Sequence, residues 1–219
     1  MKVNDIKKRL LDLDTASLAD ANKGIRIIDP GIRPLRLGLK LIGVAHTVQC
    51  HEDFLTVIKA LKDAVPGEVL VIDTKGSLAA VAGELFATEA QRKGLAGLII
   101  DGPCRDSAKI RTLNMPVYSR GQIPVAGTTS GIFETQIPIT CGGVTVNSGD
   151  ILLGDDDGII VSSATELAEL IPIAETIQTK EAAILKQMEQ GESLLGMLNF
   201  DEHWETVQSG GESQLGFKI

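Results

Sequence analysis

Three charged side chains lie at positions where proteins of alternating strands and helices usually bind their ligands. Glu84 follows Gly83 at the start of a helical stretch, and Arg105 and Asp106 follow the apolar run GLIID at 97–101. At the carboxyl end of a buried strand the backbone opens, and the next helix presents unpaired N–H groups. If the two preceding strands are neighbours, two carboxylates and one guanidinium converge. Such a set suits a hard divalent cation held largely through water, with the guanidinium beside it for an anionic oxygen.

The spacing of these residues also fits a simpler interpretation. Arg105 and Asp106 would then form a surface ion pair, and the carboxylate would serve only to stabilise a helix N-terminus. From spacing alone, this simpler interpretation is the one favoured over a metal site.

The sequence around these residues predicts alternating strands and helices, which would position them. Continuous apolar runs such as EVLVID are typical of strands buried on both faces. The predicted strands are 41–50, 68–73, 97–101 and 115–119, and the predicted helices are 4–13, 15–22, 52–64, 83–93 and 106–113. In the first strand, His46 is in register with Val44 and Val48, which indicates a packed or interfacial histidine more than a ligand.

The second half of the chain has a different composition. From Gly121 to Ser163 the sequence is rich in Gly, Thr, Val and Ile with frequent turn signals, which predicts meandering short strands. Within it, Asp155 to Gly158 are expected to form a tight turn, since the residues around them do not fit a calcium loop. A long helix is expected at about 165–190, with Pro172 near its start. We therefore predict one mixed-layer α/β domain over 1–219, in which 196–219 is a polar tail, weakly structured or packed on a neighbour.

Composition limits the classes of function. The 219 residues carry 21 Lys and Arg against 29 Asp and Glu, a net charge of −8, which argues against nucleic acid or a membrane surface as a direct ligand. The N-terminus has no apolar leader segment, so a cytoplasmic protein is expected. Three cysteines far apart in the sequence read as reduced thiols. One of them, Cys104, adjoins Arg105 and is expected to be a small packed thiol.

The segments GELFATEAQRKGLAGLIIDGPCRD, PVYSRG and GGVTVNSGDILLGDDDGIIV resemble a known family. That family holds both the regulators of ribonuclease E activity and the class II aldolases that act on 4-hydroxy-4-methyl-2-oxoglutarate and 4-carboxy-4-hydroxy-2-oxoadipate. The resemblance extends from DTASLADA and DPGIRPL to about Val161. Its aldolase branch is marked by an acidic residue, twenty intervening residues and Arg-Asp, which Glu84, Arg105 and Asp106 match. Members that only bind the ribonuclease typically lack this Asp, so Asp106 favours an enzyme.

The resemblance implies a fold, an assembly and a metal. The fold would be a layered α/β/β/α sandwich of the swivelling, phosphohistidine-domain-like type with a long C-terminal helix. Relatives form homotrimers or dimers of trimers (homohexamers), with sites at the subunit interface, where a neighbour would add an acidic side chain. Asp106 would be the one direct protein ligand of Mg²⁺ or Mn²⁺, which acts as a Lewis acid on a small 2-oxo acid. Arg105 would neutralise the enolate of pyruvate, and Glu84 would hold a metal-bound water that protonates it.

The same resemblance implies where the substrate carboxylate binds. The amides of Gly83, Leu85 and Phe86 would receive it at the helix N-terminus. One position departs from the family pattern: aldolases often carry Glu or Asp three residues after the Asp of the pair, and this chain has Lys109. A retro-aldol step needs a base for the 4-hydroxyl, whereas oxaloacetate decarboxylation does not. Lys109 therefore leaves decarboxylation a safer expectation than any particular aldol cleavage.

Two other functions are compatible with the sequence. One is a catalytically silent trimeric regulator that binds a ribonuclease or a helicase through its acidic surface. The other is an enzyme with the same metal site that acts on a different hydroxy acid or sugar acid. Weaker candidates for the site are Asp73 and Lys75, at the mouth of the neighbouring strand, and Asp20, for which a helix-surface role is equally compatible.

Overall fold

The computed structural model describes residues 1–218 and divides the chain into two compact units, Met1–Ala174 and Glu175–Ile219. The strands are β1 (Arg26–Ile27), β2 (Arg33–Pro34), β3 (Leu41–Gln49), β4 (Glu68–Asp73), β5 (Gly97–Cys104), β6 (Val117–Gln122), β7 (Ile139–Cys141), β8 (Val144–Val146), β9 (Ile151–Gly154) and β10 (Ile159–Ser162). The helices are α1 (Val3–Leu10), α2 (Thr15–Ala21), α3 (Leu55–Asp63), α4 (Glu84–Arg92), α5 (Ser107–Ile110), α6 (Ala164–Glu189), α7 (Leu194–Met197) and α8 (Phe200–Gln208).

An eight-stranded mixed sheet forms the centre of the first unit, in the order β1-β10-β9-β3-β4-β5-β6-β2. Its middle strands β3, β4, β5 and β6 run parallel, while β9, β10, β1 and β2 pair antiparallel at the two sides. The predicted strands at 41–50, 68–73, 97–101 and 115–119 correspond to these four parallel strands. A mixed α/β fold with a long C-terminal helix is thereby confirmed.

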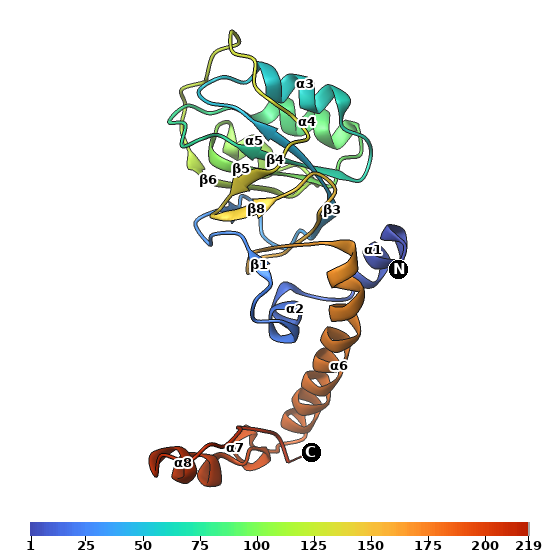
Figure 1. Cartoon of the computed structure of the whole chain (residues 1–219), viewed down its shortest axis with the longest axis vertical. Helices are drawn as coiled ribbons and strands as arrows, with labels where there is room; N and C mark the ends of the chain where they lie inside the picture. Colours follow the sequence, from blue (N-terminus) through green and yellow to red (C-terminus); the bar gives the residue numbers. More distant parts are fainter. Residues whose placement is uncertain (219) are drawn as a thin grey trace. The chain divides into compact units, whose positions relative to one another are not determined.

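Both faces of the parallel strands are covered. On one face, α3, α4 and α5 pack over apolar side chains such as Leu70, Leu98 and Ile100, and Figure 1 shows these helices on the same side of the sheet. On the other face, the separate two-stranded sheet β7-β8 packs over Val71 and Ile99. The helices α1, α2 and α6 bury a third cluster against β9 and β10. These packed layers hold in place the strands whose ends carry the candidate site.

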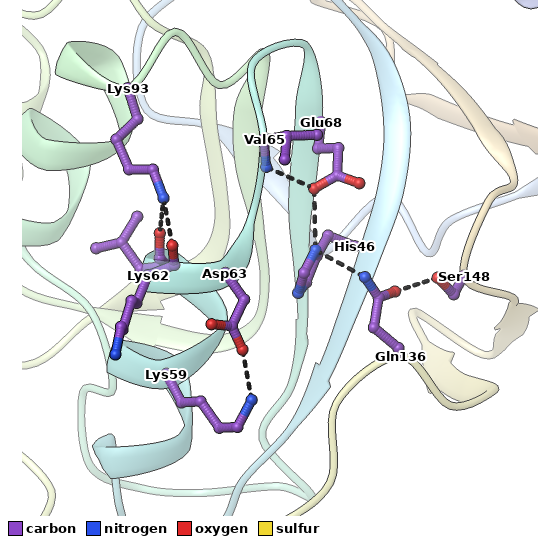
Figure 2. A network of polar contacts seen from close by, with 10 residues as sticks. His46, Lys59, Lys62, Asp63, Val65, Glu68, Lys93, Gln136 and Ser148 are labelled. Atoms are coloured by element: carbon purple, nitrogen blue, oxygen red, sulfur yellow. Dashed lines mark hydrogen bonds and ion pairs between the residues drawn. The ribbon is translucent and has the colours of Figure 1, made fainter.

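His46 lies in this covered part of β3, with only 3% of its surface exposed. Figure 2 shows its ring between two side chains: Nδ1 lies 3.0 Å from Oε2 of Glu68 and 2.9 Å from Nε2 of Gln136. Glu68 also accepts the N–H of Val65, at 2.9 Å. The prediction of a packed histidine is confirmed. Ala45 and Thr47, on the other face of this strand, are buried too, so the strand is covered on both faces.

Local signals in the sequence explain several element boundaries. The carboxylate of Asp14 accepts the N–H of Ser17 at 2.7 Å and caps α2. The predicted turn between β9 and β10 is also confirmed, with the N–H of Asp155 donating to Gly158 O at 3.0 Å. The Asp155 carboxylate ties this turn to α2 by accepting the N–H of Thr15 at 2.8 Å.

The second unit contains most of the long helix and the polar segment that follows it. The long helix is confirmed as α6, but residues 200–208 form α8 instead of a weakly structured segment. Two interactions account for this helix: acidic residues in its first turn complement the helix dipole, and the rings of Phe200 and Trp204 stack 5.9 Å apart. Asn199 also exchanges hydrogen bonds with Gly216, closing the segment on itself. The single domain over 1–219 stays a prediction.

Within residues 1–218, no helix combines the length and the apolar character needed to cross a bilayer.

Candidate active site

The adjacent parallel strands β4 and β5 bring the sequence-predicted residues together. The chain leaves β4, reaches the N-terminus of α4 at Gly83 and Glu84, and returns along β5 to Arg105 and Asp106. The N–H of Arg105 donates to Ala82 O at 3.1 Å, which joins the two segments through their backbones. Nε of Arg105 lies 3.5 Å from Oδ2 of Asp106, and the N–H of Glu84 donates to that same oxygen at 3.3 Å.

Asp106 has an unusual backbone conformation. Its φ of 57° and ψ of 30° place it in the left-handed region at the N-cap of α5. Among residues with a side chain, Asp and Asn tolerate this region best. The turn aims the carboxylate back at the N-terminus of α4 instead of at its own short helix, where it caps no N–H group.

Gly83 leaves the space that the Asp106 carboxylate occupies. A Cβ at Gly83 would lie 2.6 Å from Oδ2 of Asp106 and 2.9 Å from Cγ of Arg105, closer than real contacts allow. Gly83 is the N-cap of α4, and the first helical hydrogen bond runs from the N–H of Ala87 to Gly83 O, at 3.1 Å. Within residues 1–218, the amides of Leu85 and Phe86 have no acceptor, as expected for the first turn of a helix.

The Arg105–Asp106 pair is open to water. The two side chains are 41% and 43% exposed, so their ion pair contributes little to stability. A pair in this state keeps lone pairs and N–H groups available for a ligand. The simpler interpretation, a surface ion pair, describes the contact correctly but leaves the cavities on either side of it unexplained.

An apolar cavity of about 170 Å³ opens on one side of the pair. Its walls include Phe54, Leu85 and Phe86, along with Gly83, Arg105 and Asp106. The rings of Phe54 and Phe86 meet edge to face, with centroids 5.7 Å apart. Apolar walls of this kind keep water away from a bound ligand and strengthen the electrostatic interactions next to it.

A wider groove of about 610 Å³ lies on the other side of the pair. Its charged residues are Glu84, Arg105, Asp106 and Lys109, and Gln122 also lines it. Because Arg105 and Asp106 belong to both hollows, a ligand at the pair faces an apolar wall on one side and a charged wall on the other.

The donor set fits Mg²⁺ or Mn²⁺. Asp106 presents a half-exposed carboxylate, and Glu84 adds a second one in the same groove. Oxygen ligands of this type suit hard divalent ions, while Cys and His, which softer metals prefer, do not line the groove. Within residues 1–218, no three His, Cys, Asp or Glu side chains gather as a ready-made metal cage. A metal here would thus take Asp106 as a ligand and fill its other positions with water and substrate.

The weaker candidates lie outside these hollows. Asp73 is buried at the end of β4, where its Oδ2 lies 2.9 Å from Nζ of Lys75. Asp20 is exposed on α2 and pairs with Lys23. Cys104 is buried, with its sulfur 3.5 Å from the hydroxyl of Ser119, which confirms a packed thiol, and burial raises the pKa of that thiol.

Asp53 is a positioning residue that the sequence analysis missed. Its carboxylate is buried, with 2% exposure, and accepts four hydrogen bonds. The donors are the N–H groups of Leu55 (2.9 Å), Ser130 (2.7 Å) and Gly131 (2.9 Å) and the hydroxyl of Thr128 (2.7 Å). These bonds join the start of α3 to the loop that follows Ala126, a residue of the apolar cavity wall. Asp53 falls inside the helix predicted at 52–64, whereas α3 begins at Leu55, so Asp53 was not recognised as a residue that precedes the helix.

We expect the Asp53→Ala variant to lose about 3 kcal/mol of unfolding free energy, because several N–H donors lose their charged acceptor. Burial alone would raise the pKa of Asp53, but the hydrogen bonds outweigh it and lower the pKa from 3.8 to about 2. Since the folded-state pKa lies below the unfolded value, the stabilisation is complete above about pH 4 and is lost as the pH falls toward 2. Urea unfolding of both proteins between pH 7 and pH 2 checks this: the difference in stability must shrink in acid.

Comparisons with known proteins identify relatives of this chain. Residues 15–161 match the family model described as "RraA-like: Aldolase/RraA". A Halalkalibacterium halodurans protein named "Putative 4-hydroxy-4-methyl-2-oxoglutarate aldolase" is 38% identical over 151 residues, which are 68% of this chain and 72% of that protein. The structure of the RNA-processing inhibitor RraA from Thermus thermophilis is 28% identical, with a TM-score of 0.65 over 69% of this chain and 93% of that one. An uncharacterized protein from Pseudomonas syringae pv. tomato is 26% identical, with a TM-score of 0.77 over 88% of this chain and 92% of that one.

Proposed function

Since this chain belongs to the RraA-like family, which includes both aldolases and regulators of ribonuclease E, we propose that it is an enzyme of the aldolase branch. Its reaction would be the metal-dependent cleavage of a carbon–carbon bond in a small 2-oxo acid, with release of pyruvate. Oxaloacetate decarboxylation and retro-aldol cleavage of 4-hydroxy-4-methyl-2-oxoglutarate type substrates both pass through the enolate of pyruvate, so one site serves either.

One observation carries this proposal: a guanidinium and a carboxylate meet at the first turn of a helix, between an apolar cavity and a charged groove. A regulator that binds only a protein partner needs no such pair at the mouth of a cavity. The chemistry of an enolate needs each part of it: a cation beside the developing negative charge, an oxygen ligand for a metal, and free N–H groups for a carboxylate.

Each of these residues has its own role in the proposed reaction. The N–H groups of Leu85 and Phe86 bind the carboxylate of the 2-oxo acid, next to Gly83. When the carbon–carbon bond breaks, its electron pair moves toward the 2-oxo oxygen, and the guanidinium of Arg105 stabilises the negative charge there. Glu84 delivers a proton through water to the enolate carbon, which completes pyruvate. A divalent metal held by Asp106 would supply Lewis acidity toward the same oxygen.

Decarboxylation is the reaction to test first. A retro-aldol cleavage also needs a base for the 4-hydroxyl group, and Lys109 stands where the aldolase pattern often has a carboxylate. Oxaloacetate loses CO₂ without that base, so its turnover depends only on the groups named above.

We expect metal-stripped protein to release no pyruvate from oxaloacetate beyond the background, and to gain turnover when Mg²⁺ or Mn²⁺ is added. The rate with free metal and no protein must be subtracted, because the metal alone promotes this reaction. Ca²⁺, which is larger and a weaker Lewis acid, serves as the comparison ion. Protein that never exceeds free metal with oxaloacetate or with hydroxy-oxo acids would refute the lyase proposal in favour of the non-catalytic regulator.

We also propose that the site is completed in a homotrimer or a dimer of trimers. Apolar side chains are exposed around the site, among them Leu85 (75%), Val125 (53%) and Ile132 (86%). A monomer leaves these side chains in water, and a neighbouring subunit would cover them. Sedimentation velocity should therefore give a mass of three or six chains; a monomer at micromolar concentration would contradict the assembly.

A further inference from the structure

We propose that two copies of this chain pair through their C-terminal units, and that each copy places its helix α8 in a groove beside α6 of the other. The lining of this α6 groove includes Lys180, Ala183, Ile184 and Phe217. The inference requires neither the proposed lyase reaction nor a threefold assembly. It concerns the unit Glu175–Ile219, to which nothing above assigns a role.

The second unit buries too little apolar surface to be complete on its own. Among its described residues, only Ile184 and Met197 are buried. Nine large apolar side chains of residues 175–218 are exposed, and Leu195 is the most exposed of them, at 68%. A segment this short rarely sustains a core of its own, and oligomerisation is one of the usual ways to stabilise it. Exposed apolar side chains in this density indicate a contact with another molecule.

Three of these side chains form a ridge along one face of α8. Phe200, Trp204 and Val207 follow each other at intervals of four and three residues, which places them on the same side of the helix. They are 42%, 58% and 53% exposed. Asp201 and Glu205, each one residue further along, give this α8 ridge an acidic flank. Helices that dock in apolar grooves carry their anchoring side chains at this spacing.

The α6 groove is complementary to this ridge in size and in charge. Its volume of about 620 Å³ has room for aromatic side chains, and Ala183, Ile184 and Phe217 give it apolar walls. Lys180 adds a cation to the lining, and within residues 1–218 this lysine is exposed and forms no ion pair. The ammonium of Lys180 therefore matches the acidic flank of α8.

Hydrogen bonds of the backbone hold α8 outside the groove of its own chain. The N–H of Asn199, just before α8, donates to Gly216 O at 3.1 Å, and the N–H of Gly216 donates to Oδ1 of Asn199 at 2.7 Å. The N–H of Lys218 donates to Met197 O at 2.8 Å. These bonds fix the start of α8 beside one wall of the groove, and no side chain of the α8 ridge lines it. A second copy presents the same ridge and groove, so a two-fold pairing fills both grooves and closes.

Trp204→Ala should halve the mass of the native assembly, from six chains to three or from two to one. Aromatic anchors dominate contacts of this kind, so we expect the pairing to weaken by about thirtyfold. Sedimentation velocity of the full-length protein at micromolar concentration measures this mass. Leu11→Ala, which removes a side chain of similar exposure (62%) in the first unit, is the control and should keep the native mass.

Charge reversal tests the same contact without removing an apolar anchor. Lys180→Glu and Glu205→Lys should each weaken the pairing about fivefold, an effect typical of an exposed ion pair. The double variant should recover most of the affinity, because the two charges are exchanged. Lys186→Glu removes an exposed lysine of α6 that does not line the groove, and it serves as the control.

A disulfide between two different variants identifies the partner of α8. Ala183→Cys and Val207→Cys, coexpressed on separate full-length chains, should become linked on oxidation, because Cys50, Cys104 and Cys141 are buried and do not compete. Ala182→Cys, an exposed position of α6 outside the groove, should not link to Val207→Cys.

The outcomes separate this inference from the proposed assembly. If Trp204→Ala keeps the native mass, the inference is wrong, and a native mass of three chains would leave the proposed trimer standing. If a chain that carries both new cysteines links only to itself, α8 occupies the groove of its own chain and the inference is again wrong. A native mass of two chains that Trp204→Ala reduces to one would support the pairing and contradict the trimer.

Discussion

Replacing Asp106 with asparagine is expected to slow metal-dependent pyruvate release from oxaloacetate by about a thousandfold, the upper range for removing one charge-stabilising group from a site. The substitution keeps the size of the side chain and removes its charge. Among the described residues, Asp106 is the only one whose carboxylate faces both Arg105 and the N-terminus of α4. Asparagine also tolerates the left-handed backbone at φ 57°, which alanine would strain. The fold should therefore persist, with a loss of no more than about 1 kcal/mol from the exposed ion pair.

Steady-state assays of pyruvate, together with thermal unfolding, separate these two effects. Asp20→Asn is the matched control, because Asp20 is an exposed aspartate on α2 that pairs with Lys23. It should keep native turnover. Mn²⁺ binding gives an independent readout and should weaken only in the Asp106 variant. Native turnover in Asp106→Asn would remove this carboxylate from the mechanism.

The Gly83→Ala variant should lose about a hundredfold in turnover while remaining folded, with a loss of about 1 kcal/mol in stability because alanine is a poorer N-cap than glycine. The new methyl group would stand 2.6 Å from Oδ2 of Asp106, so the carboxylate must move away from the position that it shares with Arg105. Displacements of about 1 Å in a reacting group cost rates of this size. Gly83 itself has φ of −156°, an extended conformation that alanine adopts freely, and alanine restricts the unfolded chain.

Turnover and melting temperature measured on one preparation check this prediction. Gly158→Ala serves as the control, since a Cβ at Gly158 meets nothing within 4 Å and its turn lies between β9 and β10. A Gly83→Ala protein that is both active and stable would show that Asp106 works from another position. A protein that is inactive and unfolded would trace the loss to the fold instead of to the displaced carboxylate.

Local patterns in the sequence were sufficient to predict the parallel strands and the strand ends that lie together, whereas the choice of these ends as the candidate site also used the family resemblance. EVLVID and GLIID are apolar runs that need cover on both faces, and such strands end where ligands bind. That the residues after these runs lie together follows from β4 and β5 being neighbours, which consecutive strand and helix units favour. Glu84 and Asp106 could therefore be placed in one site before any coordinates.

Long-range strand pairing and tertiary hydrogen bonds could not be predicted from local sequence patterns. Nothing in the segment ILLG predicts that β9 pairs antiparallel with β3, because register depends on which face is buried by elements far away in the sequence. Asp53 joins α3 to a loop more than seventy residues away, and only the fold brings that loop to it. The segment that contains α8 looks polar because this helix carries three acidic residues, two of them in its first turn, and none of its residues is buried.

The left-handed turn at Asp106 also bears on how a protein of this kind can change its role during evolution. The backbone there admits Asp, Asn and Gly at little cost and penalises most other residues. Codons for Asn and Gly each differ from an Asp codon by a single base. If the proposed metal site is correct, one point mutation can silence it and leave the fold and its surfaces intact, so a lineage could pass from enzyme to binding protein without crossing an unfolded intermediate.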